Sequence, residues 1–236
     1  MSNKIPVYIE MHNKMRQLIV SNEWKKGNKI PSERDLADEF NVSRMTARQA
    51  VSSLVEEGLL ERKRGSGTFV ASEKVREKLS GIPSFTETIE KLGKTPSSKL
   101  VSYYTKRASE SESEKLAIHQ DEMVLVMERI RYANGEPICF EVATLPLVII
   151  KTFSKEQLTK HLYRTLSDNG YEVARAEQTL SATLASEKVA DLLQIKRESP
   201  ILRLRQVSYT QDSTPFEYVR AQYVGSRYEF FLEALK

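Results

Sequence analysis

The feature that most constrains this chain is an apolar stripe over residues 44–57 whose opposite side carries arginine. Five apolar side chains recur there at three- and four-residue spacing, which is the period of a helix with one buried face. These residues are Ala47, Ala50, Val51, Leu54 and Val55. Ser43 stands where a helix N-cap belongs, and Gly58 follows where a helix C-terminus favours glycine. The pattern predicts an amphipathic helix that turns Arg44 and Arg48 away from its core.

A shorter helix precedes this one, and a basic hairpin follows it. The upstream helix opens at Pro31-Ser32, and Asn41-Val42 makes the turn between the two helices. Two strands, 59–62 and 68–71, flank the basic tip 63–67, whose glycines permit positive φ. Taken alone, the helices could be a small subdomain with solvated arginines. The basic hairpin serves no core, however, so the arrangement favours a helix-turn-helix that places the second helix in the DNA major groove.

Four runs of this segment resemble the winged helix-turn-helix of the GntR family of bacterial transcription regulators. The runs are 30–37, 42–50, 58–60 and 65–70, within a resemblance that covers residues 6–72. The resemblance implies base contacts at some positions and phosphate contacts at others, beside Ser43 at the helix start. The base-contacting positions are Arg34, Arg44 and Gly65, and the phosphate-contacting positions are Thr46, Arg48 and Arg64. Met45 stands where other members often carry a polar residue.

Length and charge agree with a two-domain protein. The chain has 236 residues and a formal charge of +4, of which residues 1–72 carry +3, from 12 Lys/Arg against 9 Asp/Glu. The single cysteine, Cys139, excludes an internal disulfide. With neither a signal-peptide core nor an apolar run long enough for a membrane span, we expect a cytoplasmic protein. We expect a DNA-binding domain over 1–72, a charged linker over 73–81 and a second domain over 82–236.

The second domain contains an internal repeat. Ser-Glu-Lys-Leu-Ala at 113–117 recurs as Ser-Glu-Lys-Val-Ala at 186–190, and each copy leads into a strand, a turn and a returning strand. A helix over 155–169, followed by a strand over 171–184, separates the copies. The shared order predicts an α+β fold in which a mixed sheet has pseudo-twofold symmetry and its helices pack on one face.

Two arginines in the first copy suggest an anion site. Arg129 and Arg131 are two apart on a predicted strand, so they share a face, and their planar forks suit phosphate or carboxylate. Pairing of Arg129 with Glu128 or Glu141 on an exposed face is an equal alternative. A two-residue turn at Asn134-Gly135 would place Glu141 on the opposite face, so a site that includes Glu141 requires a loop with an odd number of residues, such as a G1-bulge turn.

A second resemblance, over residues 80–235, is to the effector-binding domain of the HutC branch of the GntR family, whose fold is similar to chorismate lyase. It implies a small-molecule pocket with an anion held by Arg129 and Arg131. Further residues implied in that pocket are Ser84, Phe85, Thr86, Glu141, Arg175, Glu217 and Tyr223. Members that bind sugar phosphates often carry a small hydroxyl residue where this chain has His161.

Three classes of function remain to be weighed. An enzyme is disfavoured, because the sequence offers no nucleophile–base pair and no cluster of metal ligands, and we expect no cofactor. A constitutive DNA-binding protein with a purely dimerising second domain is the other alternative. The favoured reading is a ligand-responsive regulator, expected to be a homodimeric repressor that a small anion such as a sugar phosphate releases from a palindromic operator.

Overall fold

The computed structural model describes residues 6–63, 65–71, 74–79 and 81–234, except for the side chains of residues 160 and 161. The chain divides into two compact units, Met1–Glu73 and Lys74–Lys236. Each unit has a hydrophobic core of its own. They are therefore described separately.

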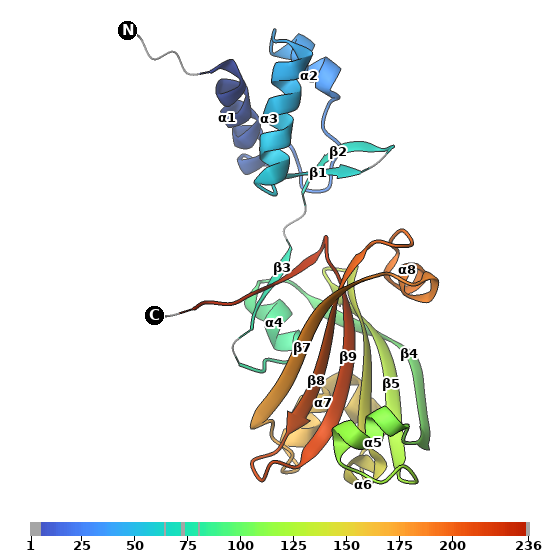
Figure 1. Cartoon of the computed structure of the whole chain (residues 1–236). Coiled ribbons are helices and arrows are strands. Elements are labelled where there is room, and N and C mark those ends of the chain that lie inside the picture. The colour runs from blue at the N-terminus through green and yellow to red at the C-terminus, as the bar shows by residue number, and fades with distance from the viewer. Residues whose placement is uncertain (1–5, 64, 72–73, 80, 235–236) are drawn as a thin grey trace. The chain divides into compact units, whose positions relative to one another are not determined.

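The first unit is a three-helix core followed by a hairpin (Figure 1). Its elements are α1 Val7–Val20, α2 Glu33–Glu39, α3 Arg44–Glu56, β1 Leu60–Lys63 and β2 Gly67–Val70. Ser32 and Asp35 form a reciprocal capping box at the start of α2. The apolar stripe of α3 is buried at Ala47, Ala50 and Leu54, against α1 and α2. The predicted winged helix-turn-helix is confirmed.

The second unit is built around a sheet of six strands in its described part, in the order β4-β5-β6-β9-β8-β7. These strands are β4 Pro96–Arg107, β5 Met123–Ala133, β6 Glu136–Pro146, β7 Arg175–Leu184, β8 Pro200–Tyr209 and β9 Pro215–Val224. Every neighbouring pair is antiparallel, so this sheet is not mixed as expected. The α+β fold class itself is confirmed.

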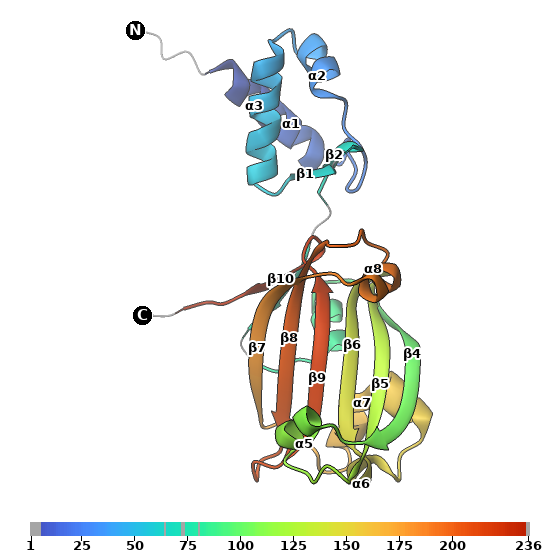
Figure 2. The ribbon, with the colours of Figure 1, turned by 45° about the vertical axis from the view of Figure 1, so that its right-hand side comes forward.

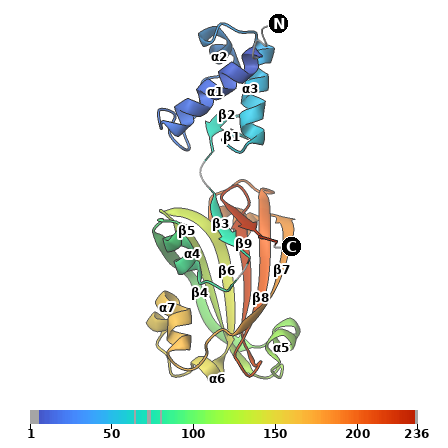
Figure 3. The same cartoon turned by 90° about the vertical axis from the view of Figure 1, so that its left-hand side faces the viewer.

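Helices cover both faces of this sheet, whereas the sequence suggested one. The helices are α4 Phe85–Lys91, α5 Glu110–Leu116, α6 Leu147–Ile150, α7 Lys155–Ser167 and α8 Glu187–Leu193. Figure 3 shows α4 and α7 on one side of the sheet and α5 on the other. We call the side of α4 and α7 the cavity face. The side of α5 and α8 is called the opposite face, since α8 packs on the outward residues Ile130, Phe140 and Ile201.

The structure contains the pseudo-twofold repeat. When its two copies are aligned, however, the similar segments 113–117 and 186–190 are displaced from each other by one helical turn. Each copy is a strand, a short helix and a hairpin, and the axis lies between β6 and β9. Ser186 is the N-cap of α8, whereas the N-cap of α5 is Ser109 and Ser113 lies inside that helix. Both helices end in a left-handed residue, Ala117 or Gln194. The two Ser-Glu-Lys segments are therefore similar in sequence, but they occupy different positions in their helices.

A bulge in each hairpin resolves the conflict over Glu141. The β5–β6 turn does have two residues, because Ala133 pairs with Glu136. The register then shifts between Arg131 and Tyr132, so that Arg129 pairs with Glu141. The extra residue that the site requires therefore lies in β6 rather than in the turn. The second copy has an equivalent shift between Ser208 and Tyr209.

The segment expected to be a linker is partly a strand of the second unit. β3, Val75–Lys78, pairs in parallel with β10, Tyr228–Phe231. Val75 is buried with Tyr228 in the main core of this unit. Alternating charges in this segment concealed the strand, because only one of its side chains is fully buried.

Candidate functional site

The N-terminal end of α3 presents its arginines to solvent. The Ser43 side chain accepts a hydrogen bond from the backbone N–H of Thr46 at 3.1 Å, and the two hydroxyl oxygens lie 2.9 Å apart. Arg34, Arg44 and Arg48 are exposed, and no described residue bonds to their guanidinium groups. Their donors are available to an external acceptor.

The hairpin tip beside α3 is open. Gly65 has φ +73°, and no atom lies within 4 Å of where a Cβ would stand. Arg64, the predicted phosphate contact next to it, lies outside the described residues. Arg62 donates to Glu33 and Ser52, both at 3.0 Å, and so fastens the hairpin to α2 and α3. No local pattern indicates this role, because the partners of Arg62 are 29 and 10 residues away.

A cavity of about 570 Å³ opens on the cavity face between α4, β5 and α7. Four predicted effector residues line it: Ser84, Thr86, Arg129 and Arg131. Polar residues that were not predicted also line it, namely Glu87, Glu90, Tyr163, Arg164, Asp168 and Glu172. Tyr163 and Arg164 were missed because α7 was interpreted only through its buried leucines, whereas Glu87 and Glu90 lie on α4. The predicted replacement at His161 also lies on α7, but that side chain is outside the described set.

The arginine pair at the back of the cavity shares one carboxylate. Glu141 accepts from Arg129 Nε at 3.0 Å and from its Nη2, and its other oxygen lies 3.4 Å from Arg131 Nε. All three residues are buried. Burial opposes ionisation of Glu141, but the two guanidiniums outweigh it and hold the pKa of its carboxyl below the usual range. The expected pairing of Arg129 with Glu141 therefore exists, but inside the protein rather than on an exposed face.

Arg131 is positioned by the segment that begins α4. It donates to Ser98 Oγ at 2.7 Å, and its guanidinium lies 4.9 Å from the centre of the Phe85 ring. Its Nε is buried without a hydrogen-bond acceptor among the described residues. Phe85 thus orients the arginine from the side, while Ser84 uses its hydroxyl to cap α4 through the N–H of Glu87.

Glu217 lies behind Tyr163, which separates it from the cavity. Tyr163 Oη donates to Glu217 at 2.7 Å and Ser208 Oγ donates to the same oxygen at 3.0 Å. Burial nonetheless raises the pKa of Glu217 to about 7. Two donors do not compensate for complete desolvation here, so this carboxyl is close to half protonated at neutral pH.

Two predicted effector residues are elsewhere. Arg175 is exposed on the edge strand β7, where it pairs with Glu177 at 2.6 Å and covers the Tyr209 ring. Tyr223 is buried in an aromatic cluster, with its ring centre 4.3 Å from that of Tyr228. Neither lines the cavity, so both assignments are corrected. Strand alternation predicts which face of the sheet a side chain points to. It does not predict whether the cavity extends along β7 to Arg175 or deep enough into the core to reach Tyr223.

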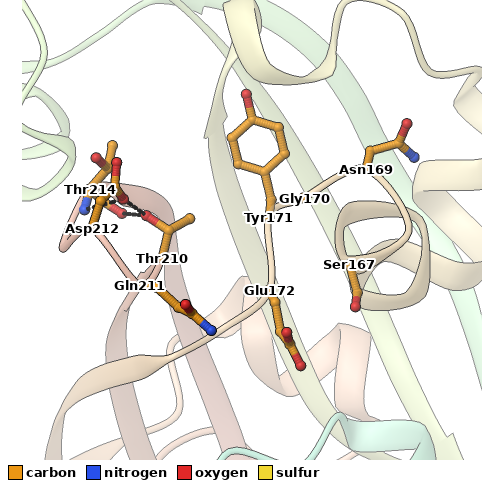
Figure 4. A pocket seen from close by; sticks show the side chains of 9 residues that line it. All are labelled: Ser167, Asn169, Gly170, Tyr171, Glu172, Thr210, Gln211, Asp212 and Thr214. Carbon is orange, nitrogen blue, oxygen red and sulfur yellow. Dashed lines mark hydrogen bonds between the residues drawn. The ribbon is translucent and has the colours of Figure 1, made fainter.

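A second hollow, of about 660 Å³, adjoins the cavity and shares Ser167 and Glu172 with it. Figure 4 shows Asp212 beside Thr210 and Thr214 on the turn between β8 and β9. Asp212 accepts a bond from the Thr214 N–H at 3.3 Å and another from the Thr210 hydroxyl. No arginine or lysine of the described chain lines this hollow, which makes it unsuited to an anion.

Within the described ranges, no three His, Cys, Asp or Glu side chains are grouped so that they could hold a metal ion. None of the helices described is both long and apolar enough to cross a membrane.

The comparisons with known proteins agree with this architecture. Residues 8–70 match the family model described as bacterial regulatory proteins, gntR family, and residues 91–229 match the UTRA domain. The chain is 33% identical to the HTH-type transcriptional repressor NagR of Bacillus subtilis, over 96% of this chain and 93% of that protein. It is 29% identical to the mannosyl-D-glycerate transport/metabolism system repressor MngR of Escherichia coli, over 97% and 96%.

A solved structure gives the same result for the fold. The crystal structure of PhnF from Mycobacterium smegmatis superposes with a TM-score of 0.69 at 28% identity, covering 95% of this chain and 99% of that one. These relatives are transcription regulators rather than enzymes, and the resemblance to the HutC branch is confirmed. With its winged helix-turn-helix and its UTRA domain, the chain belongs to the GntR family of bacterial DNA-binding transcription regulators.

Proposed function

We propose that this regulator is a homodimeric repressor, and that a small polyhydroxylated anion such as a sugar phosphate releases it from a palindromic operator. The observation that supports the anion is the arginine pair: two buried guanidiniums share the single carboxylate of Glu141. One buried positive charge is left uncompensated by that acid, and burial without a partner is costly. A ligand phosphate or carboxylate beside Arg131 would supply the missing negative charge.

The rest of the lining favours hydroxyl groups on the same ligand. Glu87, Glu90 and Glu172 line the cavity, and carboxylates accept hydrogen bonds from sugar hydroxyls. The name of the relative MngR refers to mannosyl-D-glycerate, which joins a sugar to a carboxylate.

Calorimetric titration of the full chain with sugar phosphates and sugar acids tests the cavity. Arg131→Gln removes one charged donor and should weaken binding about ten- to a hundredfold. Arg175→Gln is the matched control, because that arginine was expected in the site but lies outside the cavity. Arg131→Lys retains the positive charge but loses the planar guanidinium. It serves as a second variant if Arg131→Gln fails to fold. Equal affinity in all of these variants would refute an anion site at Arg131.

On the DNA side, we expect Arg34, Arg44 and Gly65 to contact bases. Thr46, Arg48 and Arg64 would then contact the phosphate backbone, with Ser43 beside them at the DNA-facing start of α3. Arg44→Ala should remove the preference for operator over random DNA, because a bidentate base contact contributes about 1–3 kcal/mol and a dimer loses two. Arg48→Ala should instead weaken binding to all sequences and flatten its salt dependence. A mobility-shift series over salt concentration separates the two effects, and a changed base preference in Arg48→Ala would contradict this assignment.

A twofold operator calls for a twofold protein. β7 is the end strand of the large sheet, so its outer edge pairs with no described strand. Two of its leucines are exposed, Leu180 at 40% and Leu184 at 60%. An open edge with exposed apolar side chains is suited to a second copy of this chain. Sedimentation of a Leu180→Asp, Leu184→Asp variant should give a lighter species, whereas an unchanged mass would place the dimer contact elsewhere.

Ligand binding would then act by shifting a population. The anion draws α4 and β5 together through Arg131 and the Phe85 segment, and favours a dimer whose winged helices no longer fit both half-sites. Addition of ligand should weaken operator binding in the parent protein and have less effect in Arg131→Gln. Ligand binding without any change in operator affinity would instead support a purely constitutive DNA-binding role.

A further inference from the structure

The opposite face of the large sheet has an uncovered middle. Figure 2 shows α5 and α8 at the two ends of this face, with open strands between them. The side chains that point outward here come from alternate positions of β7, β8 and β9. They include Thr179, Arg205 and Arg220.

Two of these side chains are directly opposed cations. Arg205 on β8 and Arg220 on β9 are partners in the strand register, and Thr179 pairs with Arg205 from the other side. Like charges directly opposite one another destabilise a sheet unless something lies between them. An exposed pair could simply separate into solvent, so their environment decides whether they form a site.

Neighbouring acids do not neutralise the pair. No described residue makes a hydrogen bond or ion pair with Arg205. Arg220 forms an ion pair with Glu112 at 3.5 Å and lies 5.6 Å from the centre of the Tyr218 ring, but its Nε is buried without an acceptor among the described residues. Glu112 is itself buried, and it already accepts from Lys106 and from Ser109. One shared carboxylate therefore serves Lys106 and Arg220, and none serves Arg205.

A hollow of about 360 Å³ lies over the pair, and a third cation borders it. Its walls include Ser111 and Lys115 of α5 together with Thr179, Arg205, Tyr218 and Arg220. Glu177 also borders the hollow, but its carboxylate is engaged by Arg175 at 2.6 Å and by the Tyr209 hydroxyl at 3.2 Å. The polar walls offer the hydroxyls of Ser111 and Thr179 and three cationic groups around one partly open hollow.

We propose that this hollow is a second anion site, which binds a phosphate or phosphomonoester dianion between Arg205 and Arg220, with Lys115 closing it. Two planar forks from adjacent strands suit the several oxygens of a phosphate group. The anion would remove the cross-strand repulsion and give the orphan Nε of Arg220 an acceptor. The site lies on the face away from the cavity of Arg129 and Arg131, so it stands whether or not that cavity binds the effector.

The test is an amide-resolved NMR titration of the full chain with inorganic phosphate. We expect saturable shifts at Thr179, Arg205 and Arg220, and none from sodium chloride at the same ionic strength. Arg205→Gln should weaken this binding about ten- to a hundredfold. Arg203→Gln is the matched control, because Arg203 lies on the same strand and face but does not line the hollow. Its phosphate affinity should equal that of the parent.

Several results would overturn the second site. Shifts confined to the Ser84 and Arg131 region, shifts reproduced by sodium chloride, or undiminished binding in Arg205→Gln would each do so. Sedimentation of Arg205→Gln covers the remaining alternative. A change in oligomeric state would mean that the arginine pair faces another protein copy rather than a small anion, whereas an unchanged mass together with lost phosphate shifts supports the site.

Discussion

The two halves of the large sheet share the same arrangement of strands, but they bury side chains of different charge. The bulges align Tyr132 with Tyr209, so equivalent positions of the two copies can be compared directly. Arg129, Arg131, Cys139 and Glu141 correspond to Gln206, Ser208, Glu217 and Val219. The first copy buries two cations and an anion, whereas the second buries an amide, a hydroxyl and a carboxyl whose pKa is raised to about 7. The same arrangement of strands therefore holds a charged cluster in one copy and a polar cluster with one titrating carboxyl in the other.

The strongest test of this comparison is Glu141→Gln. It leaves both buried guanidiniums without their shared acid, and removing one partner of a buried ion pair typically costs about 3–5 kcal/mol. The free energy of unfolding, measured in urea at pH 7.5, should fall by that amount. Glu177→Gln, which breaks an exposed pair on β7, should leave it nearly unchanged. Equal effects of the two variants would mean that Glu141 does not balance the arginines.

The next largest effect is the pH dependence that Glu217 contributes. Its folded-state pKa of about 7 exceeds the ordinary value of 4.5. Between these values the unfolded chain releases the proton while the folded protein keeps it, so stability falls as pH rises. The protonated carboxyl contributes fully below pH 4.5, and about 3 kcal/mol of that contribution is lost by pH 7.

Glu217→Gln isolates this contribution, because a glutamine cannot titrate. Urea unfolding of both proteins at several pH values between 4 and 8 gives the difference in their free energies. That difference should grow in favour of Glu217→Gln as pH rises, and flatten above pH 7. A constant difference would show that the Glu217 carboxyl is as acidic in the folded protein as in water. The second copy would then bury a full negative charge.

Tyr163→Phe has the smallest expected effect. It removes one donor to Glu217, at a cost of about 1 kcal/mol. Because a donor to the carboxylate oxygen favours the ionised form, its loss should also move the pH dependence of Glu217 upward. Tyr171→Phe is the control, since no hydrogen bond joins its hydroxyl to a described residue. Thermal unfolding at pH 6 and at pH 8 measures the stability of both variants. An unshifted pH profile in Tyr163→Phe would mean that the Tyr163 hydroxyl does not influence the pKa of Glu217.

The winged helix-turn-helix could be predicted in detail because its signals are local. The stripe of α3, the cap at Ser43 and the glycines near Gly65 each act within a few residues. The contact of Arg62 with Glu33 could not be predicted, because it depends on how the hairpin folds back onto α2. No periodicity within one segment contains that information.

The cavity was predictable only in part for the same reason. Arg129 and Arg131 were identified from their spacing on one strand, but the bulge that turns Glu141 toward them leaves no mark in the turn sequence. Arg175 and Tyr223 were assigned by resemblance, but they lie outside the lining of the cavity. Their positions could not be predicted, because the depth of a side chain in a sheet depends on its cross-strand neighbours. Tyr163 was missed because a helix with buried leucines gives no sign of what its polar side faces.

The parallel pairing of β3 with β10 bears on how this protein is made on the ribosome. Glu77 and Tyr228, joined by a hydrogen bond, are separated by 151 residues. The winged helix-turn-helix, which has its own core, can fold while the nascent chain is still growing. The second unit cannot complete this pairing until Tyr228 has left the exit tunnel, because β10 is the one strand of the described chain that pairs with β3. Translation therefore passes through a stage in which a folded DNA-binding unit is tethered to an unfinished sensor.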